Sequence, residues 1–190
     1  AGEITGLYGL MGAGRTELMR VAFGADRCDS GEILVAGEPV RIRNPMDAKR
    51  RGIALLTEDR KQQGLILDFD INANITLANF ASAMGMFGFA LRKENKHNQE
   101  LADSVRVKTP SLKQKARFLS GGNQQKVVLA KWLNTDSEVF IFDEPTRGID
   151  VGAKAEIYRI MNRLKQDGKA VVVVSSELTE CMGISDRIYV

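Results

Sequence analysis

The 190-residue chain is predicted to adopt an α/β fold, with a parallel sheet covered by helices and a helical insertion in the middle. Short apolar segments alternate with amphipathic segments on both sides of residues 71–115, which favours parallel strands joined by right-handed crossovers. A glycine-rich turn at 9–14 separates the first strand from the first helix. The length predicts one domain, 1–190, with a core of about 1–70 and 116–190 and a helical subdomain of about 71–115.

The individual elements follow from the spacing of apolar residues and from turn residues. Residues 31–40, GEILVAGEPV, predict a hairpin that turns at Ala36 and Gly37 and forms a small antiparallel part. The central segment has few β-branched runs and a polar stretch, RKENKHNQE, and is therefore predicted to be mostly helical. The other predicted elements are strands at 3–8, 52–57, 139–142 and 170–174, and helices at 16–23, 122–133 and 151–165.

The overall composition excludes several functional classes. The net charge is only +3 and the basic residues stand between acidic ones, so the chain is not predicted to bind nucleic acid. Cys28 and Cys181 are far apart and lack CxxC spacing, which indicates buried or surface thiols in a reducing compartment and no metal site. No apolar run reaches the roughly 18 residues that a membrane-spanning helix needs.

The first motif is the glycine-rich sequence GLMGAGRT at residues 9–16, which fits the phosphate-loop spacing between a strand and a helix. Glycines let backbone N–H groups converge on phosphate oxygens, and a hydroxyl at Thr16 can reach Mg²⁺. Position 15 is Arg instead of Lys, and a guanidinium is bulkier than an ammonium. The alternative is a glycine turn without a ligand. The predicted cofactor-binding residues here are Gly9, Gly12, Ala13, Gly14, Arg15, Thr16 and Glu17.

Two further motifs lie in the second half of the chain. The apolar strand VFIFDE delivers Asp143, predicted to hold Mg²⁺ through water, and Glu144, predicted to act as a general base. A plain strand cap is the alternative. The sequence LSGGNQQK begins a helix in which Ser120 is the predicted N-cap, and its two glycines expose N–H donors. The alternative for this motif is a capped surface helix.

Taken together, GLMGAGRTEL, TEDRKQQGL, LSGGNQQK, DEPTRGIDVGAK and SSEL resemble the ATP-binding-cassette (ABC) ATPases, in which LSGG is the characteristic signature. Within that family they resemble the C-terminal cassette of the tandem ATPases that drive bacterial import of ribose, galactose and arabinose. The resemblance implies a P-loop NTPase fold with a RecA-like core, and ATP and Mg²⁺ as cofactors. It implies that Thr16 and Asp143 serve the metal, and that Glu144, Glu58 and Ser176 occupy catalytic positions. The signature residues it implies are Ser120, Gly121, Gly122 and Gln124, with Asp150 in the loop between cassettes.

The resemblance also implies partners and a location. The expected partners are a second cassette stacked head to tail, provided by the N-terminal half of the same polypeptide, and transmembrane permease subunits. A periplasmic sugar-binding protein would act indirectly, and the expected location is the cytoplasmic face of the bacterial inner membrane. The chain itself is expected to be a fragment. Residues 83–91, AMGMFGFAL, are expected either to pack in the core or to form a groove for the membrane subunit.

Three residues depart from the family pattern at its phosphate site. Arg15 replaces Lys, Glu58 stands where the family has Gln, and Ser176 stands where it has the switch His. The sole histidine, His97, lies in the polar stretch and is predicted to be solvated. These departures predict a degenerate site that binds ATP and hydrolyses it poorly. The alternative is a regulatory cassette with no hydrolysis of its own.

Overall fold

The computed structural model describes residues 1–10, 12–85 and 88–190. The chain divides into two compact units. The first comprises Ala1–Leu55, Ser137–Pro145 and Met161–Val190, and the second comprises Leu56–Asp136 and Thr146–Ile160. Each unit is therefore built from segments that are distant in the sequence.

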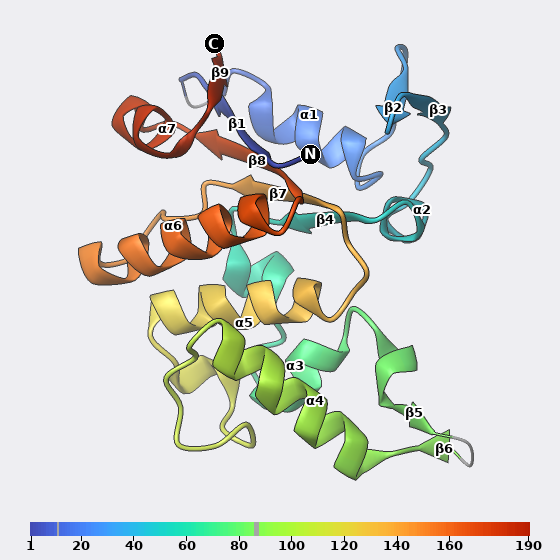
Figure 1. Ribbon diagram of the computed structural model, residues 1–190, viewed down its shortest axis with the longest axis vertical. Helices are drawn as coiled ribbons and strands as arrows, with labels where there is room; N and C mark the ends of the chain where they lie inside the picture. The colour runs from blue at the N-terminus through green and yellow to red at the C-terminus, as the bar shows by residue number, and fades with distance from the viewer. Residues whose placement is uncertain (11, 86–87) are drawn as a thin grey trace. The chain divides into compact units, whose positions relative to one another are not determined.

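The first unit is organised around a five-stranded sheet (Figure 1). Its strand order is β4-β7-β8-β1-β9, and the β1–β8, β1–β9 and β7–β8 pairs are parallel. The strands are β1 (Glu3–Tyr8), β4 (Ile53–Leu56), β7 (Val139–Asp143), β8 (Ala170–Ser175) and β9 (Arg187–Tyr189). Buried apolar side chains of the inner strands form the core of this unit, which includes Ile4, Phe140, Phe142, Val171 and Val173.

Helices and a hairpin complete the first unit. The helices are α1 (Arg15–Ala22), α2 (Pro45–Arg50), α7 (Leu178–Ile184) and the end of α6 (Val151–Gln166). The predicted hairpin is confirmed as β2 (Ile33–Val35) and β3 (Glu38–Val40), and Figure 1 shows it apart from the larger sheet. Its turn residues Ala36 and Gly37 have φ of 53° and 82°, the left-handed conformation that a tight hairpin turn needs.

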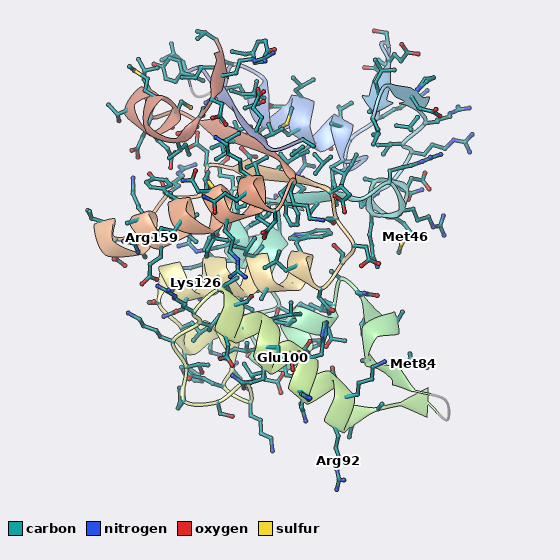
Figure 2. All side chains as sticks on the ribbon, viewed as in Figure 1. Met46, Met84, Arg92, Glu100, Lys126 and Arg159 are labelled. Atoms are coloured by element: carbon teal, nitrogen blue, oxygen red, sulfur yellow. The ribbon has the colours of Figure 1, made fainter. Side chains whose placement is uncertain are left out.

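The second unit is mainly helical and is packed around α5 (Gly121–Leu133). Its other elements are α3 (Ile71–Thr76), α4 (Leu91–Ser104), η1 (Arg60–Gly64), η2 (Phe80–Ala83), η3 (Ala116–Phe118), β5 (Met84–Gly85) and β6 (Gly88–Phe89). α5 packs against α3, α4 and η1, and even its charged Lys126 (labelled in Figure 2) is buried. Lys126 forms an ion pair with Glu156 and donates to the Arg106 carbonyl at 2.9 Å, so its buried charge is compensated.

The middle of the chain differs from the sequence-based expectation in one element. Met84 pairs with Phe89 in a short antiparallel ladder, so the predicted helical segment contains two short paired strands. Gly85 pairs with Gly88 in the same ladder, and glycine is unfavourable in helix interiors. Within the 83–91 stretch, Ala83 is buried whereas Met84 and Leu91 are exposed; residues 86–87 lie outside the described residues.

The predicted domain division stays a prediction, but the two compact units follow different limits. α5 belongs to the predicted core in chain order, yet it packs against the helices of the predicted insertion. Expecting His97 to be solvated was wrong. Its ring is half-buried and its Nε2 lies 2.9 Å from Oδ1 of Asn134, because α4 packs against α5.

The two cysteines and the length of the apolar helices can also be compared with the sequence-based expectations. Cys28 is exposed and Cys181 is buried, and both are free thiols. Within the described residues, no helix is both long enough and apolar enough to cross a membrane.

Lys131 in α5 provides a pH-dependent test of the packing in the second unit. Its ammonium donates to the Gly64 carbonyl at 2.6 Å, lies 5.3 Å from the Trp132 ring centroid, and has a pKa lowered to about 8 by burial. The unfolded chain keeps this proton up to about pH 10.4, so the stability of the folded state rises as pH increases from 8 toward 10. We expect the unmutated protein to gain about 2 kcal/mol relative to Lys131→Met between pH 7.5 and 9.5 in urea unfolding. If the free energies of unfolding of the two proteins changed in parallel with pH, Lys131 would not have a lowered pKa in the folded state.

Candidate functional site

Several predicted site residues of the first unit follow strands that end at one edge of its sheet. Tyr8 at the end of β1 pairs in register with Ser175 at the end of β8, and Asp143 at the end of β7 pairs with Val174. The segments that follow these parallel strands are therefore brought together at their carboxyl ends. Open α/β sheets bind ligands at this edge.

The loop after β1 has the backbone of an anion-binding turn. Gly12 and Gly14 have φ of 82° and 80°, and a Cβ added at either would meet no atom within 4 Å, so both face open space. α1 begins after Gly14, which has no side chain to cap it, so the N–H groups of its first turn can be donated to a phosphate. Ala13 N donates to the Leu10 carbonyl at 3.1 Å, and Met11 lies outside the described residues.

Arg15 is bound to protein groups of this same edge. Its Nη1 donates to the Ser175 carbonyl, its Nη2 donates to the Leu10 carbonyl at 3.2 Å, and Nη2 lies 3.7 Å from Oε1 of Glu144. Its stem passes beside Gly9, where an added Cβ would lie 3.2 Å from Arg15 Cδ. The guanidinium thus connects the loop, the end of β8 and the candidate base.

Thr16 and Asp143 form the candidate magnesium position. Thr16 Oγ1 donates to Asp143 Oδ1 at 3.1 Å, and Asp143 is 2% exposed. Burial raises the pKa of Asp143 to about 6, and the hydrogen bond from Thr16 partly opposes this shift. Among the described residues, no group of three or more His, Cys, Asp or Glu side chains could hold a metal ion. The hydroxyl and carboxylate suit Mg²⁺, which binds proteins through one or two such oxygens and takes its other ligands from phosphate and water.

Glu144 has an unusual backbone for a residue with a side chain. Its φ is 45°, in the left-handed region, and its N–H donates to the Val174 carbonyl at 2.9 Å. Strained residues of this kind are concentrated at functional sites. Ser176 follows β8 directly and is half-buried, and Glu17 lies in the first turn of α1. The predicted residues of the first unit thus lie at the end of β7 or in the segments that follow β1, β7 and β8, while Glu58, Gln124, Asp150 and the signature lie in the second unit.

In the second unit, the signature turn (Ser120, Gly121 and Gly122) begins α5. Ser120 is the N-cap, and its Oγ accepts from Asn123 N at 3.4 Å and from Asn123 Nδ2 at 3.0 Å, which confirms the capping prediction. A Cβ at Gly122 would lie 2.5 Å from Cβ of Ala153 in α6, closer than two carbons can approach. α5 and α6 therefore make contact at this glycine.

The remaining predicted residues of the second unit have internal partners. Glu58 forms an ion pair with Arg147, and these residues line a pocket of about 390 Å³ together with Asp59, Arg60, Lys61 and Gly148. Asp150 Oδ1 accepts from Ala153 N at 2.9 Å, at the start of α6. Gln124 is 4% exposed and donates to the Ala116 carbonyl at 3.1 Å, so its predicted role at the nucleotide stays a prediction.

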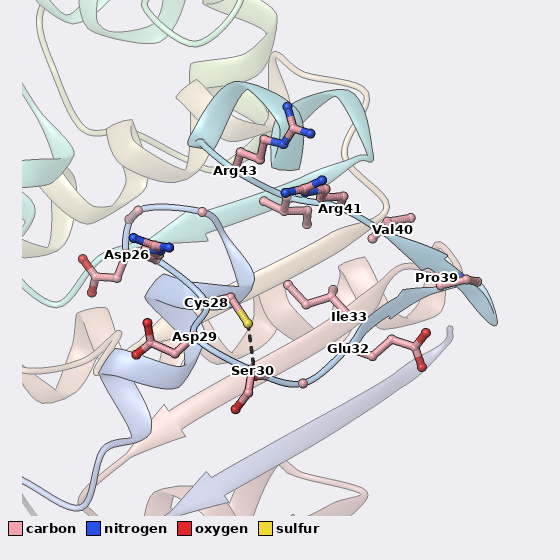
Figure 3. A pocket seen from close by; sticks show the side chains of 15 residues that line it. Asp26, Cys28, Asp29, Ser30, Glu32, Ile33, Pro39, Val40, Arg41 and Arg43 are labelled. Carbon is pink, nitrogen blue, oxygen red and sulfur yellow. Dashed lines mark hydrogen bonds between the residues drawn. The ribbon is translucent and has the colours of Figure 1, made fainter.

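A larger pocket, which no sequence motif marks, lies in the first unit beside the β2–β3 hairpin (Figure 3). It has a volume of about 760 Å³ and is lined by residues between 24 and 33 and between 39 and 43. Cys28 Sγ donates to the Ser30 carbonyl at 3.3 Å, as the dashed line shows. No predicted site residue lines it.

The sheet order, the glycine loop and the acidic strand end together define a P-loop nucleotide-binding fold of the ABC type, and solved structures share it. The ATP-binding cassette MJ0796, solved as a dimer in a post-hydrolysis state bound to ADP and Pi, superposes with a TM-score of 0.81 at 23% identity, over 98% of this chain and 80% of that chain. The cbiO1 protein of Clostridium perfringens gives a TM-score of 0.80 at 19% identity, over 99% and 72%.

Sequence comparison identifies the family. Residues 1–147 match the family model described as ABC transporter, and the chain therefore belongs to this family. One relative is a putative ribose/galactose/methyl galactoside import ATP-binding protein of Albidiferax ferrireducens, 54% identical over 191 residues, which cover 100% of this chain and 38% of the relative. Another is the ribose import ATP-binding protein RbsA of Bacillus subtilis, 51% identical over 190 residues, with the same two coverages. The chain thus spans less than two fifths of the length of these relatives.

Proposed function

We propose that this chain is the C-terminal ATP-binding cassette of an ATPase that drives sugar import in a bacterium. The observation that supports it most strongly is the sheet edge at which Gly12, Gly14, Thr16 and Asp143 come together, in a chain about half identical to ribose and galactose import ATP-binding proteins. In this proposal, residues 1–190 form one cassette.

The residues of the first unit have distinct roles in this proposal. The first-turn N–H groups of α1 bind the phosphates of ATP, and Gly12 and Gly14 let them approach closely. Thr16 Oγ1 and Asp143 hold Mg²⁺, which neutralises phosphate charge when it is bound. Glu144 occupies the position of the general base for the attacking water and lies 3.7 Å from Nη2 of Arg15.

The same geometry supports a degenerate phosphate site. The Arg15 guanidinium is bonded to two carbonyls and close to Glu144, so the base is held by a cation of its own chain. Ser176 stands where a switch histidine would act, and loss of one such group typically slows the reaction by roughly 10²- to 10⁴-fold. The site would then hold ATP as a clamp while the signature turn completes a working site on a partner cassette. The regulatory alternative, a cassette with no hydrolysis of its own, rests on the same observations.

The proposed partners follow the relatives and the signature turn. A second cassette, the N-terminal half of the same polypeptide, would stack head to tail on this one, and permease subunits would bind the pair. The chain's length relative to its relatives leaves room for a second cassette in them. A periplasmic sugar-binding protein would act through the permease, with the cassettes on the cytoplasmic face of the inner membrane. No nucleic-acid partner is proposed.

The proposed function is tested with the full-length ATPase assembled with its membrane subunits in lipid vesicles. We expect MgATP-dependent phosphate release that rises at least about threefold when a binding protein loaded with ribose or galactose is added. The unloaded binding protein is the matched control. Phosphate release that no pentose or hexose stimulates would refute sugar import, and absence of any phosphate release would refute the ATPase as a whole.

A further inference from the structure

Three separate segments of the second unit meet at the guanidinium of Arg60. Arg60 is the first residue of η1, two residues after Glu58. Its Nη1 donates to the Arg147 carbonyl at 3.0 Å and its Nη2 lies 3.4 Å from the Gly148 carbonyl. A Cβ added at Gly121, the first residue of α5, would lie 2.8 Å from the same Nη2. The segment after β4, the loop before α6 and the signature turn therefore share one contact.

The loop of residues 147–150 (the 147–150 loop) is shaped to accept both donors. Gly148 has a φ of 66°, a left-handed conformation that glycine adopts easily. Beyond it, Ile149 is buried and Asp150 caps α6, so the loop is anchored at its far end. Arg60 anchors its near end, and the planar fork of a guanidinium can reach two carbonyls at once whereas an ammonium is a point donor.

Arg60 bonds to uncharged acceptors, and the carboxylates next to it in the sequence are bound to other groups. The carboxylate of Glu58 pairs with the Arg147 side chain, and Asp59 Oδ1 accepts from the backbone N–H groups of Lys61 and Gln62. Both acceptors of Arg60 are neutral carbonyls, and its Nε is buried without a hydrogen-bond partner among the described residues. Burial accordingly lowers the pKa of this guanidinium. One planar guanidinium that bonds two fixed backbone carbonyls points to a positional role.

We propose that Arg60 is a positioning residue that fixes the 147–150 loop against the signature turn, so that the Glu58 segment, the loop and the first turn of α5 move together. The fit at Gly121 carries this step, because the guanidinium fills the space in which a side chain would stand. The inference rests on the proposed function in one respect, that the signature turn serves an ATP bound by the partner cassette. Removing the Arg60 contacts would then lower the rate of ATP hydrolysis in the closed state. Nucleotide binding at this chain's own phosphate loop would not be weakened.

The test compares Arg60→Met with Lys61→Met, which removes an equal charge from an exposed neighbour lining the same pocket. In the full-length subunit, trypsin cleavage after Arg147 is followed by mass spectrometry; in the assembled complex, kcat and KM for ATP are measured. For Arg60→Met we expect cleavage about tenfold faster and kcat at least about tenfold lower, with KM changed less than about twofold. Arg60→Lys should recover part of both losses, and Lys61→Met should match the unmutated protein.

Three other results of this comparison would count against the proposals. Arg60→Met that behaves like Lys61→Met in cleavage and in kcat would overturn the proposal. Equal losses in kcat and in nucleotide affinity would also overturn it, because they indicate general unfolding. If the unmutated complex releases no phosphate, the proposed function fails, while the cleavage comparison still decides whether Arg60 holds the loop.

Discussion

A Gly122→Ala variant is expected to lose stability and ATP hydrolysis together, and Ala153→Gly in the same chain is expected to restore both. The reason is the 2.5 Å separation between an added Cβ at Gly122 and Cβ of Ala153. Overpacking of this kind costs about 1–3 kcal/mol and would shift the first turn of α5, whose N–H groups are proposed to serve ATP on the partner cassette. Moving the methyl group from position 153 to position 122 keeps the volume of the contact unchanged.

This prediction is checked by urea unfolding of the full-length protein and by phosphate release from the assembled complex. Gly122→Ala alone should slow phosphate release by about a hundredfold, and the double variant should come within about tenfold of the unmutated rate. Ala153→Gly alone is the matched control and should cost at most about 1 kcal/mol. Additive losses in the double variant would show that Gly122 is needed for some reason other than its contact with α6.

An Arg15→Lys variant is expected to bind ATP at this chain's phosphate loop about tenfold more tightly than the unmutated protein. The Arg15 guanidinium bonds to the Ser175 and Leu10 carbonyls and lies close to Glu144, and in the proposed site ATP would have to displace it from these partners. Charge-assisted hydrogen bonds are worth about 1.5–3 kcal/mol each, so replacing this clamp with a compact ammonium lowers the cost of binding.

The binding is measured by calorimetry on the full-length protein with the phosphate loop of the other cassette disabled. Arg15→Met serves as the control, because it removes both the clamp and the positive charge and should gain no affinity. A Lys variant that binds ATP no more tightly than the unmutated protein would show that the Arg15 guanidinium does not limit binding.

The parts of the fold that were predicted correctly have strong local patterns. Continuous apolar runs at 139–142 and 170–174 became the buried strands β7 and β8, and the alternation at 3–8 became β1. The hairpin could be predicted because Ala36 and Gly37 separate two short segments in GEILVAGEPV. In the structure both residues have the left-handed φ of a tight turn. Glycine spacing likewise located the phosphate-type loop before any contact was known.

The parts that were missed depend on contacts between distant residues. The acceptor of Arg15 is the backbone carbonyl of Ser175, 160 residues away, and a backbone carbonyl leaves no mark on the residue type. Arg60 was invisible for the same reason, since both its acceptors are carbonyls. The half-buried position of His97 is set by the packing of α4 on α5, which a polar local sequence does not reveal.

The most direct test of the asymmetric cassette is steady-state phosphate release by the assembled full-length transporter carrying Glu144→Gln. Because the Glu144 carboxylate lies 3.7 Å from Nη2 of Arg15, we expect this carboxylate to contribute little to turnover, and the rate should stay within about twofold of the unmutated complex. A fall of about a hundredfold or more would show instead that Glu144 is a working base and that Arg15 and Ser176 are tolerated in an active site.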